Sequence, residues 1–250
     1  MRISWKKVTT LLFDFGGTLD LPGAHWLDRF LAHYREAGVD LTREELDRAY
    51  DYATRRGYQA GEPIYAYGLR RLVDQLVAWQ VDYLIEHIPG RVPPALRDAA
   101  GRIAQSFCAQ SAAGFEQSRV ALATLAPRFR IGVVSNFYGN LEAVLKEAGL
   151  LPLVTAAVDS ARVGAFKPDP AIFKAALARL GARPAESAMV GDSLNKDCAP
   201  ARRLGMGTVW LMPASVEYTQ FVAKNADATA DADLVVRNLK ELVEICLGAD

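Results

Sequence analysis

Short, mainly apolar runs alternate with segments of helical periodicity along most of this 250-residue chain. Apolar strands separated by helices are typical of a parallel β-sheet that is covered on both faces. We therefore predict an α/β protein whose core is built on such a sheet. The predicted strands are residues 9–13, 130–136, 154–160, 187–192, 207–212 and 233–236, and the helices among the later strands are 141–148, 171–180, 197–204 and 236–246.

The long stretch between the first two predicted strands has a different pattern. It contains almost no strand signal and repeats apolar residues at helical spacing. One of its helices begins after Thr42, and Glu45 follows three residues later, which is the pattern of a capping box. We predict a Rossmann-like core formed by residues 1–20 and 113–250, with an inserted helical cap formed by residues 21–112.

Composition and charge argue against several classes of protein. The chain is 51% hydrophobic and 23% charged, and its formal net charge is +0, so we expect no nucleic-acid partner. No apolar run approaches the roughly 18 residues of a membrane span, and the N-terminus does not resemble a signal peptide. Cys108, Cys198 and Cys246 are odd in number and widely spaced, which disfavours disulfides and zinc sites. We expect a cytoplasmic protein without a membrane partner, and its oligomeric state stays open.

Polar side chains stand at the ends of four predicted strands, where open parallel sheets bind their ligands. They are Asp14 after the first strand, Ser135 and Asn136 at the end of the second, Lys167 after the third, and Asp192 with Asp197 after the fourth. An aspartate can act as a nucleophile, and a hydroxyl and a lysine can hold phosphoryl oxygens. The further carboxylates suit Mg²⁺, which prefers one or two carboxylates together with waters and phosphate. The set therefore predicts phosphoryl-transfer chemistry, which needs mainly positioning and charge neutralisation.

The order and spacing of these residues resemble the haloacid dehalogenase-like hydrolase superfamily. Its four motifs are matched by DFGGT (14–18), VVSN (133–136), KPDP (167–170) and GDSLNKD (191–197). The resemblance covers nearly the whole chain, and the helical insertion lies where that family has its cap domain. It implies a Mg²⁺-dependent hydrolase that acts on a small phosphorylated metabolite.

The resemblance also implies a role for each matched position. Asp14 would be the nucleophile that forms an aspartyl-enzyme intermediate, with Ser135 and Lys167 as its catalytic partners. Asp197 would act in the outer shell of the metal or orient Lys167, and Gly16 would offer only its backbone carbonyl. The substrate-binding set would be Ser135, Asn136, Lys167, Gly17 and Thr18, and the metal-binding set would be Asp14, Gly16, Asp192 and Asp197.

Gly16 departs from the pattern of the family's phosphatases, which have an aspartate there as the general acid/base. Such a group is worth about 10²–10⁴-fold in rate. With glycine at this position, the acid would have to come from the cap or the substrate, or the leaving group would have to depart without one. Asp20 is the nearest other acid in this segment, but the family often uses that position in a structural or gating turn. Among the three histidines, His25 is the best candidate to face the site.

Two alternatives stay open because of Gly16. The first is a non-catalytic homologue that binds a phosphorylated ligand or a protein partner. The second is a dehalogenase-type hydrolase, since the family's dehalogenases also lack an acid here, although they usually lack the metal acid matched by Asp192. Phosphonate hydrolases of the family use a cap lysine, and this chain has no lysine between Lys7 and Lys146.

Overall fold

The computed structural model describes residues 5–93, 95–213 and 230–248. Their strands form one six-stranded sheet in the order β3-β2-β1-β4-β5-β6, in which every neighbouring pair is parallel. The strands are β1 (Thr10–Phe13), β2 (Arg130–Ser135), β3 (Ala156–Asp159), β4 (Ser187–Gly191), β5 (Gly207–Leu211) and β6 (Leu234–Val236). All six predicted strands are confirmed, with bounds that differ by one or two residues.

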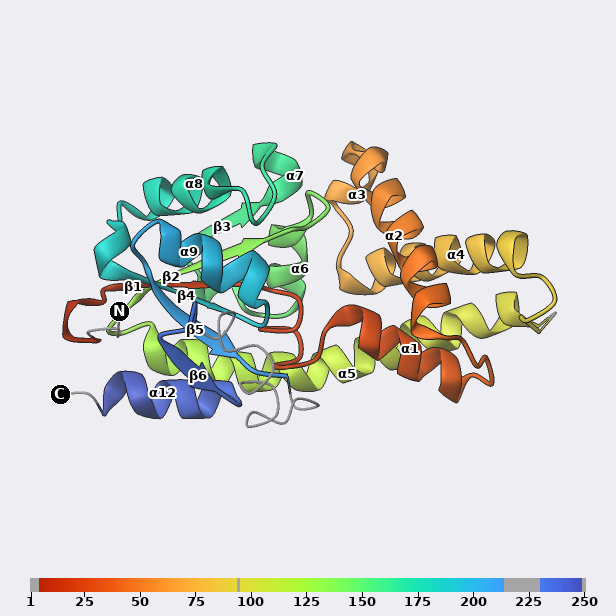
Figure 1. Cartoon of the computed structure of the whole chain (residues 1–250), viewed down its shortest axis with the longest axis horizontal. Helices are drawn as coiled ribbons and strands as arrows, with labels where there is room; N and C mark the ends of the chain where they lie inside the picture. Colours follow the sequence, from red (N-terminus) through yellow and green to blue (C-terminus); the bar gives the residue numbers. More distant parts are fainter. Residues whose placement is uncertain (1–4, 94, 214–229, 249–250) are drawn as a thin grey trace.

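Helices cover both faces of this sheet (Figure 1). Because side chains alternate along a strand, Leu12 of β1 packs in one apolar cluster and its neighbours Leu11 and Phe13 pack in another. The first cluster includes residues of α8 and the second includes residues of α5 and α12, so β1 is buried on both sides. The helices of the core are α6 (Leu141–Glu147), α7 (Ser160–Val163), α8 (Pro170–Leu180), α9 (Ala199–Arg203) and α12 (Leu239–Leu247).

Two of the predicted helices differ from the structure. The helix expected over residues 197–204 is a π-helical turn, Leu194–Cys198, followed by the short α9. The helix expected from Val236 begins at Leu239, because Val236 is the last residue of β6 and pairs with Leu211. The side chain of Asn238 caps α12 by accepting the amide N–H of Glu241.

The cap consists of α1 (Trp26–Glu36), α2 (Arg43–Ala60), α3 (Glu62–Tyr65), α4 (Leu69–His87) and the first part of α5 (Leu96–Leu125). The predicted capping box is confirmed, since Thr42 accepts the amide N–H of Glu45 and the Glu45 carboxylate accepts that of Thr42. The 30 residues of α5 run beneath both the cap and the core (Figure 1). The boundary predicted between residues 112 and 113 therefore falls inside a continuous helix.

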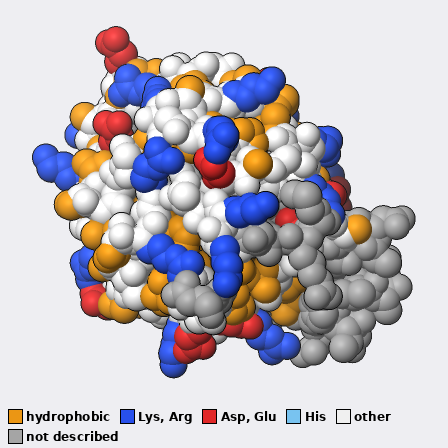
Figure 2. Space-filling model, turned by 90° about the vertical axis from the view of Figure 1, so that its left-hand side faces the viewer, with side chains coloured by type: hydrophobic (Ala, Val, Ile, Leu, Met, Phe, Trp, Pro, Cys, Tyr) orange, Lys and Arg blue, Asp and Glu red, His pale blue; other side chains and the backbone are white. Residues whose placement is uncertain are grey.

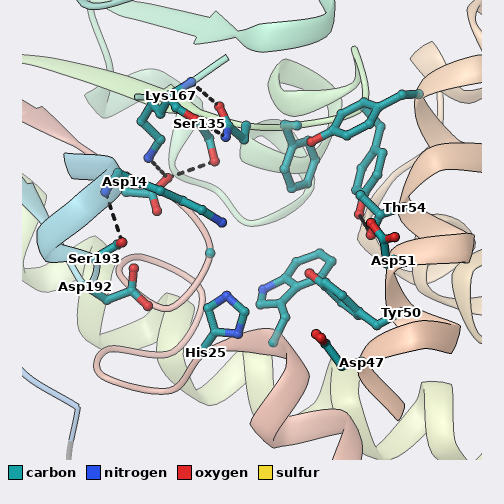
Figure 3. A pocket seen from close by; sticks show the side chains of 17 residues that line it. Asp14, His25, Asp47, Tyr50, Asp51, Thr54, Ser135, Lys167, Asp192 and Ser193 are labelled. Carbon is teal, nitrogen blue, oxygen red and sulfur yellow. Dashed lines mark hydrogen bonds and ion pairs between the residues drawn. The ribbon is translucent and has the colours of Figure 1, made fainter. Parts of the chain in front are cut away.

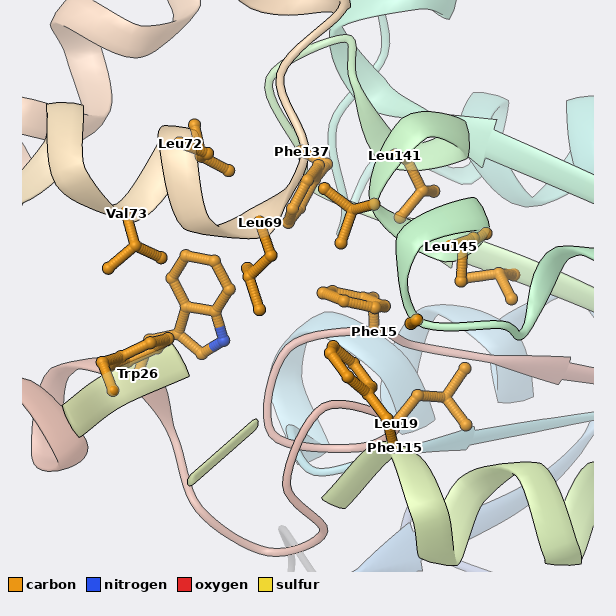
Figure 4. Close-up of a cluster of buried hydrophobic side chains, with 14 of the residues drawn as sticks. Phe15, Leu19, Trp26, Leu69, Leu72, Val73, Phe115, Phe137, Leu141 and Leu145 are labelled. Carbon is orange, nitrogen blue, oxygen red and sulfur yellow. The ribbon is translucent and has the colours of Figure 1, made fainter. Parts of the chain in front are cut away.

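One apolar cluster joins the cap to the core (Figure 4). Phe15 and Leu19, from the loop that follows β1, lie within it and are fully buried. The cluster continues through α4 (Leu69, Leu72, Val73), α5 (Phe115) and α6 (Leu141, Leu145). Burying each large apolar side chain stabilises the fold by about 1.5–3 kcal/mol. This packing fixes the loop after β1, and with it the residues that follow Asp14.

The face of the core that lies away from the cap carries Lys and Arg side chains spread over its surface (Figure 2). They are scattered among polar and apolar atoms and do not gather into one patch in this view. No helix in the described part of the chain is long and apolar enough to cross a membrane.

Candidate active site

Asp14 lies at the carboxyl end of β1, where its amide N–H still bonds to the carbonyl of Val190 in β4 (2.9 Å). Its Oδ1 accepts a hydrogen bond from Ser135 Oγ (2.9 Å) and forms an ion pair with Lys167 Nζ (2.7 Å). Both contacts fall on one oxygen, and within the described residues Oδ2 has no hydrogen-bond partner. The parallel sheet therefore brings three predicted catalytic residues together and leaves one oxygen of Asp14 available.

Lys167 is buried between two carboxylates. Its Nζ lies 2.7 Å from Asp14 Oδ1 and 2.6 Å from Asp197 Oδ1. Burial by itself lowers the pKa of Lys167, but the charges of Asp14 and Asp197 outweigh it and raise the pKa above its ordinary value. Asn136 holds the loop in place, because its side chain accepts the Lys167 amide N–H (2.7 Å) and donates to the Lys167 carbonyl (2.9 Å). In this structure Asn136 therefore positions Lys167, which follows β3 and precedes a cis peptide bond to Pro168.

Three carboxylates meet beside Lys167. Asp14, Asp192 and Asp197 each offer an oxygen, and these oxygens all lie within 4.8 Å of one another. Burial raises the pKa of Asp192, and the neighbouring charges of Asp14 and Asp197 raise it further. Burial likewise raises the pKa of Asp197 to about 6, although Lys167 lowers it in part. Clustered carboxylate oxygens at this spacing are the ligands that hard divalent cations prefer.

The three carboxylates differ in how far their oxygens are already occupied by hydrogen bonds and ion pairs. Asp197 is fully buried, with Oδ1 on Lys167 and Oδ2 accepting the amide N–H of Ser193 (3.0 Å). Its close approach requires glycine at position 191, where any Cβ would collide with the Asp197 carboxylate. Asp14 and Asp192 are left to contact a metal, and Gly16 lines the same cavity with a carbonyl that accepts no hydrogen bond from the described part of the chain. The donor set thus fits Mg²⁺, with Asp197 orienting Lys167.

The two glycines after Phe15 are constrained by different neighbours. A Cβ at Gly16 would lie 3.3 Å from Nε1 of Trp26, so the indole fills the space beside the backbone there. Gly17 has a positive φ of 77°, and a Cβ there would collide with the Asp192 carboxylate. Gly17 and the buried Thr18 form the turn and do not line the cavity described below. Their contribution is to shape the loop between Asp14 and Asp192.

Asp20 is fully buried beneath this turn. Its Oδ1 accepts the amide N–H groups of Gly17 (2.7 Å) and Leu21 (2.8 Å), and its Oδ2 accepts the indole N–H of Trp26 (2.7 Å). The same Oδ2 forms an ion pair with the buried guanidinium of Arg29. Asp20 is therefore a structural residue that ties the turn to α1, and it does not line the cavity.

A cavity of about 380 Å³ opens between the carboxyl ends of the strands and the cap (Figure 3). On the core side it is lined by Asp14, Ser135, Lys167 and Asp192, together with Ser193 and Lys196. On the cap side the lining comes from α2 through Asp47, Tyr50, Asp51, Thr54 and Tyr58. Sequence reasoning did not single out these α2 residues as part of the site. Their spacing of three or four residues places them on one helical face, but spacing alone does not tell which face meets the core.

His25 also lines the cavity, between Asp192 and Tyr50 in Figure 3. It caps the N-terminus of α1, because its Nδ1 accepts the amide N–H of Leu27 (3.2 Å). Burial lowers the pKa of His25, and the charge of Lys196 adds to that effect. The expectation that His25 faces the site is therefore met, with its Nδ1 occupied by the cap of α1.

Residues 8–205 match the haloacid dehalogenase-like hydrolase family. Haloacid dehalogenase-like hydrolase domain-containing protein 3 of Danio rerio is 31% identical over 185 residues, which are 72% of this chain and 74% of that protein. Glyceraldehyde 3-phosphate phosphatase of Pyrococcus furiosus is 37% identical over 82 residues, 33% of this chain and 32% of that protein. The crystal structure of a HAD phosphatase from Thermococcus onnurineus covers 97% of this chain and 99% of its own, with a TM-score of 0.54 at 21% identity, which shows a common fold.

Proposed function

The chain belongs to the haloacid dehalogenase-like hydrolase family, and from this we propose a Mg²⁺-dependent phosphatase that acts on a small phosphorylated metabolite. One observation carries the proposal. Asp14 has one oxygen free while Ser135 and Lys167 hold the other, and Asp192 lies beside them in the same cavity. Such a set can attack phosphorus, bind the phosphoryl oxygens and neutralise their charge.

The residues of the site would act in two steps. Asp14 Oδ2 would attack the phosphorus and form an aspartyl-phosphate, while Ser135 Oγ and Lys167 Nζ bind phosphoryl oxygens. Water would then attack the phosphorus of that intermediate and return Asp14 to its carboxylate form. Asp197 would keep Lys167 in place throughout, since its Oδ1 lies 2.6 Å from Nζ and does not depend on Asp14.

Mg²⁺ fits the oxygen ligands that remain. The residues that would hold it are Asp14, Asp192 and the carbonyl of Gly16. When bound, it would neutralise charge on the phosphoryl group and on the clustered carboxylates. The presence of Asp192 beside Asp14 favours a phosphatase over a dehalogenase, because the family's dehalogenases usually lack that acid.

The relatives support a phosphatase as well. The phosphatase from Pyrococcus furiosus acts on glyceraldehyde 3-phosphate according to its name, but its alignment spans only 33% of this chain. We therefore do not extend its substrate to this protein. A non-catalytic role stays the second candidate, because a Cβ at Gly16 would lie 3.3 Å from Trp26, so the indole fills the place beside Gly16.

The proposal is tested by hydrolysis of p-nitrophenyl phosphate with Mg²⁺, with chelator, and in the variant Asp14→Asn. We expect the variant to lose at least about 10³-fold in turnover, because it removes the nucleophile, and we expect chelator to abolish activity. Asp40→Asn is the matched control, since Asp40 is an exposed cap acid whose side chain is 90% exposed. Undiminished turnover in Asp14→Asn, or chelator-resistant release of halide from a haloacid, would contradict the proposal.

A further inference from the structure

The loop that follows Asp14 offers no free acid to a departing alcohol, and Asp47 and Asp51 line the cavity from α2, on the side away from Asp14 (Figure 3). Gly16 has no side chain, and Asp20 is fully occupied by its contacts below the turn. Asp197 is held by Lys167 and by the amide of Ser193. Because a general acid is worth about 10²–10⁴-fold, esters of ordinary alcohols would lose about that factor.

His25 does not fill this gap. The amide N–H of Leu27 bonds to its Nδ1, so the neutral ring carries its proton on Nε2. Burial and Lys196 lower the pKa of the imidazole, while Asp28 and Asp14 oppose them only in part. A lowered pKa leaves less of the ring in the imidazolium form, which is the form that transfers a proton to a departing oxygen.

Part of the cavity wall is aromatic, beside the acids Asp47 and Asp51 of α2. The rings that line it are those of Trp26, Tyr50, Tyr58, Phe137 and Tyr138. Tyr58 and Tyr138 lie 5.0 Å apart between ring centres, and Trp26 and Phe137 lie 6.0 Å apart in an edge contact. The parts of these rings that face the cavity can make stacked or edge contacts with a ring of the substrate. The wall therefore suits a flat aromatic group next to the phosphoryl site.

These two observations converge on one substrate class. Resting on the proposed function, we propose that the substrate is a small aryl phosphate, whose leaving group departs as a stabilised aryloxide without a proton from the enzyme. The bond from Asp14 Oδ2 to phosphorus forms while the bond from phosphorus to the aryl oxygen breaks, and the electron pair leaves with that oxygen. One proton of the attacking water reaches the aryloxide through solvent, and the other stays on the released phosphate.

Trp26 lies beside Gly16 and also in the aromatic part of the cavity wall. Its indole is fixed by the hydrogen bond to Asp20 (2.7 Å) and by an edge contact with Phe107 (5.1 Å between centres). The same indole lies 3.3 Å from any Cβ at Gly16, so one side chain both lines the cavity and crowds the position of the absent acid. The indole that crowds position 16 therefore also forms part of the aromatic surface of the cavity.

The test compares kcat/KM with Mg²⁺ for four substrates: p-nitrophenyl, phenyl, benzyl and acetyl phosphate. Phenyl and benzyl phosphate both present a ring, but only phenyl phosphate releases an aryloxide. Acetyl phosphate has a good leaving group without a ring. We expect phenyl phosphate to exceed benzyl phosphate by at least about 10²-fold, the value of the missing acid, and p-nitrophenyl phosphate to exceed acetyl phosphate by about tenfold through ring contacts.

Each result that contradicts these expectations refutes a different part of the proposal. Benzyl and phenyl phosphate hydrolysed at similar rates would show that the enzyme supplies a proton, and would overturn the inference while keeping the proposed function. Acetyl phosphate hydrolysed as well as p-nitrophenyl phosphate would overturn recognition of the ring. No Asp14-dependent hydrolysis of any of the four would refute the proposed function itself, and the inference with it.

Discussion

Replacing Asp20 with asparagine removes one charge from a fully buried pair. In the wild type the Asp20 carboxylate accepts hydrogen bonds from two backbone amides, from the Trp26 indole and from Arg29. Arg29 is also buried, and its remaining donors bond to three groups of α5: the Phe107 carbonyl (2.9 Å), Ser111 Oγ (2.7 Å) and Gln110 Oε1 (2.9 Å). An asparagine would turn an N–H₂ group toward donors in either orientation, and it would leave the guanidinium without a counter-charge.

Removing one partner of a buried ion pair costs about 3–5 kcal/mol, because the other charge stays buried without compensation. For a chain of this length each kcal/mol lowers the unfolding midpoint by about 2–4 °C. We therefore expect Asp20→Asn to lower the midpoint by about 6–20 °C. The double variant Asp20→Asn with Arg29→Met removes both charges, so it should be less destabilised than the sum of the two single variants.

The assay is thermal or urea unfolding of the four proteins of this cycle, with turnover measured at a temperature where all are folded. Since Asp20 does not line the cavity, we expect turnover to stay within about tenfold of the wild type, although the variant is less stable. A variant that is as stable as the wild type but inactive would refute the reasoning, because Asp20 would then act as the catalytic acid.

The remaining predictions concern the acidic cluster and Gly16. Burial raises the pKa of Asp192 and raises that of Asp197 to about 6 in the folded protein, so their stabilising contribution is present at low pH and is lost as the pH rises through these values. Mg²⁺ should therefore raise the unfolding midpoint more at about pH 7.5 than at about pH 5. An equal effect of Mg²⁺ at both pH values would contradict this expectation. Asp192→Asn should stabilise the metal-free protein and abolish most of the effect of Mg²⁺ on the midpoint. Gly16→Ala should cost about 1–3 kcal/mol through overpacking against Trp26. Its control is Gly101→Ala in α5, where nothing lies within 4 Å of the added Cβ and alanine favours the helix, so the control should be at least as stable as the wild type. A Gly16→Ala variant whose unfolding midpoint is no lower than that of the wild type would show that Trp26 does not restrict position 16.

The sequence is sufficient to predict the sheet and which candidate residues the sheet brings together. Asp14, Ser135, Lys167 and Asp192 lie at or after the carboxyl ends of four strands of one parallel sheet. Parallel strands end at the same edge, so the meeting of these residues follows from topology. The cap lining could not be predicted in the same way. The face that α2 turns toward the cavity, with Tyr50 on it, depends on how the helices of the cap pack against α5.

The environment of Gly16 also could not be predicted from the sequence. Trp26 lies ten residues further along, and nothing in its spacing shows that its indole fills the place beside Gly16. The structural role expected for Asp20 fits its place under the turn, but its buried partner Arg29 could not be read from the sequence. Both facts depend on side-chain packing between the loop after β1 and α1, which periodicity does not describe.

The central claim is that Asp14 carries the phosphoryl group during turnover. In the most direct test, the enzyme is mixed with p-nitrophenyl phosphate and Mg²⁺ and quenched with acid after one turnover. The protein is then digested, and the mass of the peptide that contains Asp14 is measured. We predict that this peptide gains one phosphoryl group in the wild type, and that the same peptide of Asp14→Asn does not. Hydrolysis that proceeds while no peptide with Asp14 gains the group would contradict the account.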